Sequence, residues 1–370
     1  MGVRSLGPWR RLDLMVVALP AAVAARLLHS GAAVLFILSA LAVVPLAGLV
    51  GRSTEVLAET VGGSKGALLN ATFGNMAELM IAALLVLNGE VAVLKASITG
   101  SIIGNLLLLL GVAMVVAGRG KGEVRITATS QVQSTMLFLA IGILLLPTVF
   151  SFRPESSTTR LDEVSWLVAL TLFVVYALSL LFMLRTNRSL FRTESAAEGP
   201  SDGPGEEGSG SEELGNTWSV KGAVIVLAVA TVLVAIAAEL VAGSVQEAGT
   251  SLGLHSGFIG FVILPLVGNA AEQFSALALA AKDRLGTASE IAVGASMQLA
   301  MLVVPVLVLL GAVTGHPFDL AFSPLELTAL TVGTLLTRQL LDDGKTNWLE
   351  GVMLLGLYLS FAGAVFFAEI

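Results

Sequence analysis

Long apolar stretches recur along the whole chain and are separated by short polar ones. Apolar runs of roughly 18 or more residues are typical of helices that span a bilayer, which need about 20 residues each. We count eleven such segments, at residues 12–29, 33–51, 66–88, 93–117, 129–150, 163–184, 219–243, 257–281, 287–312, 322–340 and 347–368. The pattern therefore predicts an all-α polytopic membrane protein with about 11 transmembrane helices.

The composition agrees with a chain that is solvated by lipid. Of the 370 residues, 55% are hydrophobic and only 13% are charged, whereas soluble domains carry about 25% charged residues. The chain has no cysteine, which excludes disulfides, thiolate metal sites and cysteine nucleophiles. It also has no Walker motif, no HExxH and no nucleophile–base set within the apolar segments. We therefore expect no enzyme, no bound cofactor and no nucleic-acid partner.

Basic residues are distributed unevenly over the predicted loops. With eleven helices and the N-terminus inside, sixteen of the twenty Lys and Arg residues fall on the cytoplasmic side, as the positive-inside rule requires. These are Arg4, Arg10, Arg11, Arg52, Lys65, Arg119, Lys121, Arg125, Arg185, Arg188, Arg192, Lys221, Lys282, Arg284, Arg338 and Lys345. Only Arg26, Lys95, Arg153 and Arg160 fall on the other side. The distribution predicts a multi-pass protein of the cell (inner) membrane with a cytoplasmic N-terminus.

An acidic linker divides the chain. Residues 193–213 are rich in Gly, Ser, Pro and Glu, and they hold seven acidic residues, which equals the net charge of −7. Such a composition predicts disorder. The linker either attracts cations to the cytoplasmic mouth or is only a solvated tether. We predict an extra N-terminal helix (1–31), a first transmembrane repeat (32–184), the cytoplasmic linker (185–218) and a second repeat (219–370).

The two halves resemble each other in sequence. A shift of 194 residues aligns GNMAE at 74–78 with GNAAE at 268–272, and Gly100 with Gly294. Over residues 66–112 this ungapped shift gives ten identities. In the predicted topology the two copies run in opposite directions, so they form an inverted repeat. Secondary transporters with such repeats bind their substrate near the midplane, where the repeats meet.

Glu78 and Glu272 are the main candidates for the transport site. Each lies near the middle of an apolar segment, where an acidic residue costs about 2.5–3.5 kcal/mol on insertion scales and usually faces a functional cavity. A purely structural glutamate would need a buried basic partner, and no Lys or Arg lies at the middle of these segments. We therefore predict that the two glutamates bind both the metal ion and the protons.

Polar neighbours extend this candidate site. Asn75 and Asn269 precede the glutamates by three residues and share their helical face, as ligands or as interhelical hydrogen-bonding groups. Gly74 and Gly268 lie one turn before the glutamates, where glycine either loosens the helix and frees backbone carbonyls or serves close packing. The segments that follow add four residues that we expect to line the site: Ser101, Asn105, Ser296 and Gln298.

The predicted ligands are all oxygen atoms. Ca²⁺ takes 6–8 oxygen ligands in flexible geometry, whereas Mg²⁺ keeps its waters. His29, His255 and His316 all fall near outer segment ends, so no imidazole favours a transition metal or carries protons through the core. Burial and a neighbouring carboxylate both disfavour the charged form of a carboxylate. One pair of glutamates can therefore hold either a divalent cation or protons, which is the physical basis of exchange.

Several motifs resemble those of the Ca²⁺/H⁺ antiporter family within the cation/Ca²⁺ exchanger superfamily. They are GNMAELMIAALL with KASITGSIIGN in the first half, GNAAEQFSALALAAK with AVGASMQLAMLVVPVLVLLG in the second, and the flanking LAVVPLAGLVGRSTEVLAETVG. The resemblance implies two inverted five-helix repeats plus an extra first helix, and an acidic loop between the halves. It places the family's acidic pair on Glu78 and Glu272. A shared site that loads Ca²⁺ where protons are scarce and releases it where they are abundant predicts export of cytoplasmic Ca²⁺ driven by protons.

The sequence departs from the family pattern at three places. Ala77 replaces a Thr, Gln273 replaces a His, and the stretch at 295–298 lacks hydroxyls that the family has. The alternative function is therefore Na⁺/Ca²⁺ or monovalent cation/H⁺ exchange within the same superfamily. The lost hydroxyls argue against sodium coupling, because sodium sites need extra oxygen ligands. Expected partners are membrane lipid, Ca²⁺ and protons, and a homo-oligomer is left open.

Overall fold

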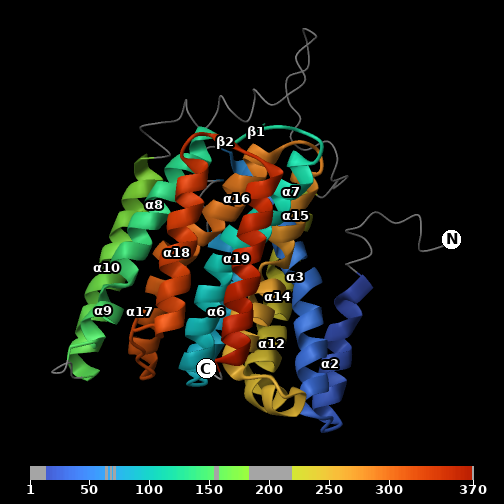
Figure 1. The fold of residues 1–370 in the computed structure, drawn as a ribbon. Coiled ribbons are helices and arrows are strands. Elements are labelled where there is room, and N and C mark those ends of the chain that lie inside the picture. The colour runs from blue at the N-terminus through green and yellow to red at the C-terminus, as the bar shows by residue number, and fades with distance from the viewer. Residues whose placement is uncertain are drawn as a thin grey trace.

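The computed structural model describes residues 14–62, 66, 69, 72–153, 158–182 and 219–368. Its helices lie side by side in one bundle (Figure 1). In the first half they are α2 (Ala18–Leu27), α3 (Ala32–Val61), α5 (Met76–Leu87), α6 (Val91–Ile103), α7 (Leu110–Gly118), α8 (Ala128–Leu144), α9 (Leu146–Ser151) and α10 (Thr158–Leu181). In the second half they are α12 (Val220–Leu252), α13 (Ser256–Phe258), α14 (Leu264–Gly268), α15 (Ala270–Ala280), α16 (Leu285–Gln298), α17 (Val304–Thr314), α18 (Pro324–Leu341) and α19 (Trp348–Phe367).

Seven of the described helical stretches are long and apolar enough to cross a membrane, and a bent pair makes up to eight. This confirms a helical, multi-pass membrane protein. Helical residues occur in all eleven predicted segments, but eleven crossings and the inverted arrangement of the repeats stay predictions. The linker 193–213 and the first residues of segment 12–29 lie outside the described part of the chain.

Three short π-helices interrupt otherwise regular helices in the described part of the chain. They are η3 (Gly104–Leu109) between α6 and α7, η5 (Ile259–Ile263) between α13 and α14, and η6 (Leu299–Val303) between α16 and α17. The helical path continues through each of them. Such insertions locally change which side chains face the bundle interior, and they are frequent at functional sites. All three flank segments that hold predicted site residues.

The longest helices, α3 and α12, pack against each other along much of their length. They contain 30 and 33 residues, which corresponds to roughly 45–50 Å at about 1.5 Å per residue. A bilayer core is only about 30 Å thick, so both helices are long enough to reach beyond it or to tilt within it. Their outward sides carry exposed apolar residues such as Ile37, Ile225 and Val232, as a surface facing lipid requires.

One end of the bundle is closed by a small sheet. Strand β1 (Val124–Arg125) pairs antiparallel with β2 (Lys345–Thr346), and both lie at the end opposite the last turn of α19 (Figure 1). Two exposed ion pairs accompany it, between Lys121 and Asp283 at 2.6 Å and between Lys345 and Glu123 at 2.9 Å. We call this the sheet end of the bundle.

At the opposite end of the bundle, an ion pair and side-chain hydrogen bonds hold the segment that joins α17 to α18. Lys95 Nζ on α6 lies 2.7 Å from Asp319 Oδ1 and also donates to the Ala321 carbonyl. The Thr148 hydroxyl donates to the Leu320 carbonyl at 3.1 Å and accepts from the Phe322 N–H at 3.0 Å. These bonds satisfy backbone groups that have no helical partner, so the joining segment is held against the bundle.

The crossing of α6 and η5 allows a stability test at Gly100. A Cβ at Gly100 would overlap the carbonyl oxygen of Phe261, whereas a Cβ at Gly104 on the same helical path would meet nothing within 4 Å. We expect Gly100→Ala to lower the midpoint of thermal unfolding in detergent clearly, because overpacking a core costs about 1–3 kcal/mol. The matched Gly104→Ala variant should unfold like the wild type. Equal midpoints for both variants would show that this helix contact is looser than described.

Candidate ion-binding site

Both GN motifs lie at helix breaks. Asn75 immediately precedes α5 with φ −96° and ψ 22°, and Asn269 immediately precedes α15 with φ −95° and ψ 7°. In the second half, the stretches on either side of Asn269 are bent by 62°. In both halves the helix is interrupted at the asparagine that follows the glycine. Gly74 lies within the turn that leads into Asn75.

These breaks place the two glutamates at equivalent positions. Glu78 and Glu272 are each the third residue of a new helix, within the first turn of α5 and α15. The first backbone N–H groups of a helix have no intrahelical acceptor, and the helix dipole is positive at this end. Each carboxylate therefore lies where negative charge is favoured, although it is surrounded by apolar helices.

Side chains from the two halves meet around Glu78. Asn269 Nδ2 donates to Glu78 Oε1 at 3.5 Å. A Cβ at Gly268 would lie 3.7 Å from Glu78 Cβ, so the second break packs directly on this glutamate. Glu272 lies three residues after Asn269, in the first turn of α15. The structure thus brings together motifs that are 194 residues apart.

Several oxygens around the glutamates are buried without a partner. Asn75 Oδ1, Ser101 Oγ, Asn105 Oδ1 and Glu272 Oε2 have no hydrogen-bond donor among the described residues. A buried polar atom left unsatisfied costs about 1–3 kcal/mol. Asn75 Oδ1 and Glu272 Oε2, which belong to the two GN motifs, are therefore available to a cation or to a proton donor.

Asn75 connects this cluster to α16. Its Nδ2 donates to Gln298 Oε1 at 2.8 Å, which leaves Asn75 Oδ1 free toward the site. The amide of Gln298 consequently orients the Asn75 side chain. In contrast, the Ser296 hydroxyl donates to the carbonyls of Ala292 at 3.0 Å and Ile102 at 3.4 Å. Ser296 is thus placed on a helix–helix contact, where its hydroxyl donates to backbone carbonyls.

The donor set matches oxygen-only coordination. Among the described residues, no group of three or more His, Cys, Asp and Glu side chains could hold a metal ion. The candidate ligands are therefore two carboxylates together with amide and hydroxyl oxygens. Oxygen ligands of these kinds are the ones that bind Ca²⁺, which would be the transported ion. Mg²⁺ demands near-octahedral geometry and gives up its waters reluctantly, so it fits this loose set of side chains less well.

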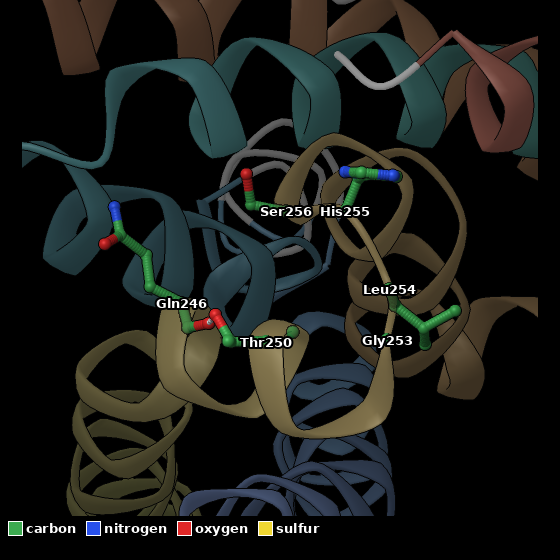
Figure 2. A pocket seen from close by; sticks show the side chains of 7 residues that line it. Gln246, Thr250, Gly253, Leu254, His255 and Ser256 are labelled. Carbon is green, nitrogen blue, oxygen red and sulfur yellow. Dashed lines mark hydrogen bonds between the residues drawn. The ribbon is translucent and has the colours of Figure 1, made fainter.

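A pocket lies elsewhere, at the end of α12. It has a volume of about 570 Å³ and is lined by Gln246, Thr250, His255 and Ser256, among others. Figure 2 shows these side chains around the turn between α12 and α13. Ser256 begins α13 thirteen residues before Asn269, which is roughly 20 Å along a helix. This pocket is thus remote from the glutamates, and His255 is remote with it.

Sequence reasoning missed several buried polar residues. The side-chain oxygens of Thr54, Gln133 and Thr337, among others, are also buried without a hydrogen-bond partner among the described residues. The signal was present for Gln133, because a glutamine within an apolar segment is as costly as the asparagines that we did single out. Thr54 and Thr337 give no such signal, because a threonine in a helix usually bonds to a carbonyl of the preceding turn.

Comparison with known proteins identifies the family and several relatives of this chain. The family described as "Sodium/calcium exchanger protein" matches residues 31–185 and 222–367. A Ca(2+)/H(+) antiporter of Aphanothece halophytica is 38% identical over 362 residues, covering 95% of each chain. Another of Synechocystis is 39% identical over 361 residues, covering 96% of each chain. The solved structure of native YfkE superposes with a TM-score of 0.80 at 31% identity, covering 96% of this chain and 99% of that one.

Proposed function

Because the chain belongs to the sodium/calcium exchanger protein family, we propose that it is a secondary transporter that exchanges Ca²⁺ for H⁺. The relatives that support this coupling are named Ca(2+)/H(+) antiporters, and the alignments cover nearly the full length of both chains. In this proposal Glu78 and Glu272 form one shared site, which holds either Ca²⁺ or protons.

One observation carries the proposal. Glu78 and Glu272 stand at equivalent helix starts in different halves of the chain, Asn269 of the second motif donates to Glu78, and unpaired amide and carboxylate oxygens belong to the same motifs. A structural role would leave the desolvation of these carboxylates and several unpaired oxygens without compensation. A divalent cation neutralises both charges and satisfies the oxygens at once. Protons can neutralise the same carboxylates when no cation is bound.

The proposed cycle exports Ca²⁺ from the cytoplasm. The sheet end carries most of the described basic residues, including Arg125, Arg284 and Arg338, so we assign it to the cytoplasmic side. Cytoplasmic Ca²⁺ binds where protons are scarce and is released where they are abundant. The inward proton gradient then drives export. Five-helix repeats related by an axis in the membrane plane would expose the shared site to each side in turn.

The proposal is tested by flux of ⁴⁵Ca²⁺ in proteoliposomes with an imposed pH gradient. We expect Ca²⁺ to move against its own gradient when protons flow the other way, in sodium-free buffer. Collapse of the pH gradient with a protonophore should stop this uptake. Uptake that requires a Na⁺ gradient and ignores the pH gradient would favour the sodium-coupled alternative instead.

Orientation is tested separately by cysteine labelling, since the chain has no native cysteine. Ser209→Cys in the linker should resist impermeant thiol reagents added outside intact cells. The control is Ser251→Cys, at an exposed position near the opposite end of the bundle, which should react readily. Reaction at 209 and none at 251 would reverse the assignment of sides.

A further inference from the structure

We propose that Gln133 is a further residue of the ion pathway, whose side-chain carbonyl oxygen contacts the cation on its way between the sheet end and the two glutamates. This inference rests on the proposed transport function and extends it beyond the GN motifs. Gln133 belongs to α8, which contributes none of the residues described above as the candidate site.

The position of Gln133 is unusual for a glutamine. Its side chain is only 8% exposed, and its Oε1 atom has no hydrogen-bond partner among the described residues. The amide lies against α16 at Gly294, where an added Cβ would be 3.4 Å from Nε2 and 3.7 Å from Oε1. The absence of a side chain at Gly294 thus leaves room for this amide between the two helices.

Gly294 connects Gln133 to the glutamate site. Gln298 lies four residues further along α16 and therefore on the same face, one turn away. Helical side chains point back toward the N-terminus of their helix, so the amide of Gln298 extends toward the turn that contains Gly294. Gln298 in turn accepts the hydrogen bond from Asn75. The amides of Gln133, Gln298 and Asn75 therefore form a polar series that leads from α8 to the break before Glu78.

Hydroxyl groups continue this series toward the sheet end. Ser130 Oγ lies 2.7 Å from Ser289 Oγ across the α8–α16 contact, and Thr127 Oγ1 lies 3.0 Å from Ser130 Oγ. All three side chains are buried. Thr127 caps α8 two residues after strand β1. A seam of polar side chains thus runs along the contact between α8 and α16.

Interhelical bonding alone accounts for part of this seam. The Ser130–Ser289 pair satisfies both hydroxyls and holds the two helices together, as polar pairs in membrane proteins commonly do. It does not account for Gln133, because a residue kept only to join helices would have its carbonyl oxygen bonded. A methionine of similar volume would fill the same space without an unpaired acceptor. The free oxygen is accounted for if a hydrated cation contacts it in passing.

Accessibility gives the first test. In the cysteine-free chain, Gln133→Cys should react with a positively charged methanethiosulfonate reagent applied at the sheet end, and Ca²⁺ should slow this reaction at least severalfold. Two matched controls lie on the same helix. Val132→Cys, at a 37% exposed position beside it, and Leu137→Cys, at a 1% exposed position one turn further, should not react. A Gln133→Cys protein that is unreactive, or equally reactive with and without Ca²⁺, would overturn the proposal.

Transport by two conservative variants gives the second test and does not depend on a cysteine being tolerated. Gln133→Met keeps the volume but removes the oxygen, so the Ca²⁺ concentration for half-maximal uptake from the sheet end should rise roughly five- to tenfold. Gln133→Glu keeps a side-chain oxygen and should retain the wild-type value or lower it. A packing role predicts the opposite order, with methionine tolerated and a buried charge harmful, and that order would refute the inference.

The two levels of proposal fail in different ways. If the wild-type protein does not exchange Ca²⁺ for protons, the proposed function fails whatever position 133 does. If the wild type exchanges these ions while Gln133→Met is normal and Gln133→Cys is unreactive, only the pathway role of Gln133 fails.

Discussion

Replacing either Glu78 or Glu272 by glutamine is expected to abolish Ca²⁺-for-proton exchange. Glutamine has nearly the same shape, but it neither titrates nor provides the negative charge that a divalent cation needs. Because both carboxylates belong to one proposed site, each single variant should be as defective as the double variant. The measurement is pH-gradient-driven ⁴⁵Ca²⁺ flux in proteoliposomes that contain equal amounts of folded protein.

A neighbouring position provides the control for this prediction. Gln273 follows Glu272 directly, and the resemblance to the antiporter family leads one to expect histidine there. Gln273→His should keep exchange within about twofold of wild type, as a change that touches neither charge of the site. Substantial exchange by either glutamate variant, with normal thermal stability, would show that the site does not depend on the carboxylate pair.

Ca²⁺ binding is expected to weaken as the pH falls. Two carboxylates in a site of low dielectric cannot both stay charged without a cation, because desolvation and mutual repulsion favour protonation. Bound Ca²⁺ displaces these protons, so the cation-free state holds more protons than the cation-bound state. Lower pH therefore stabilises the cation-free state. By linkage, release of two protons would change Kd by up to about a hundredfold per pH unit.

Equilibrium binding of ⁴⁵Ca²⁺ to purified protein between pH 6 and 8 measures this dependence. Glu78→Gln serves as the comparison, since one carboxylate can release at most one proton. Its residual binding should be weaker at high pH and should show the shallower slope. An equal slope in the wild type and the variant would mean that other groups are titrated.

Much of this account could be predicted from the sequence, because membrane helices have strong local signals. Apolar length predicts a multi-pass protein, and the glutamates stand out within apolar segments where charge is costly. The repeated GN-x-A-E pattern predicts that residues 78 and 272 act together. The structure brings their surroundings into contact through Asn269 and Gly268. Family membership, inferred from the same motifs, is confirmed by the comparisons.

Other features depend on three-dimensional packing and have no local signal. The exact side-chain partners are of this kind: Gln298 bonds to Asn75, whereas Ser296 bonds to backbone carbonyls. Hydropathy alone gave α12 an end near residue 243, yet the helix extends to Leu252. Its last turns carry polar residues that end the apolar run without breaking the helix. Gln133 shows the same limitation, because its relation to Gln298 arises only where α8 crosses α16.

The number of protons released per bound Ca²⁺ tests the central claim most directly. Calorimetric titration in several buffers of different ionisation enthalpy, at one pH near 7, separates the heat of binding from the heat of proton uptake by the buffer. If Glu78 and Glu272 hold either protons or Ca²⁺ at one site, the wild-type protein should release between one and two protons per Ca²⁺, and Glu78→Gln should release fewer. Ca²⁺ binding with an affinity independent of pH and without proton release would contradict the account, and would leave a channel or a sodium-coupled carrier as the better explanation.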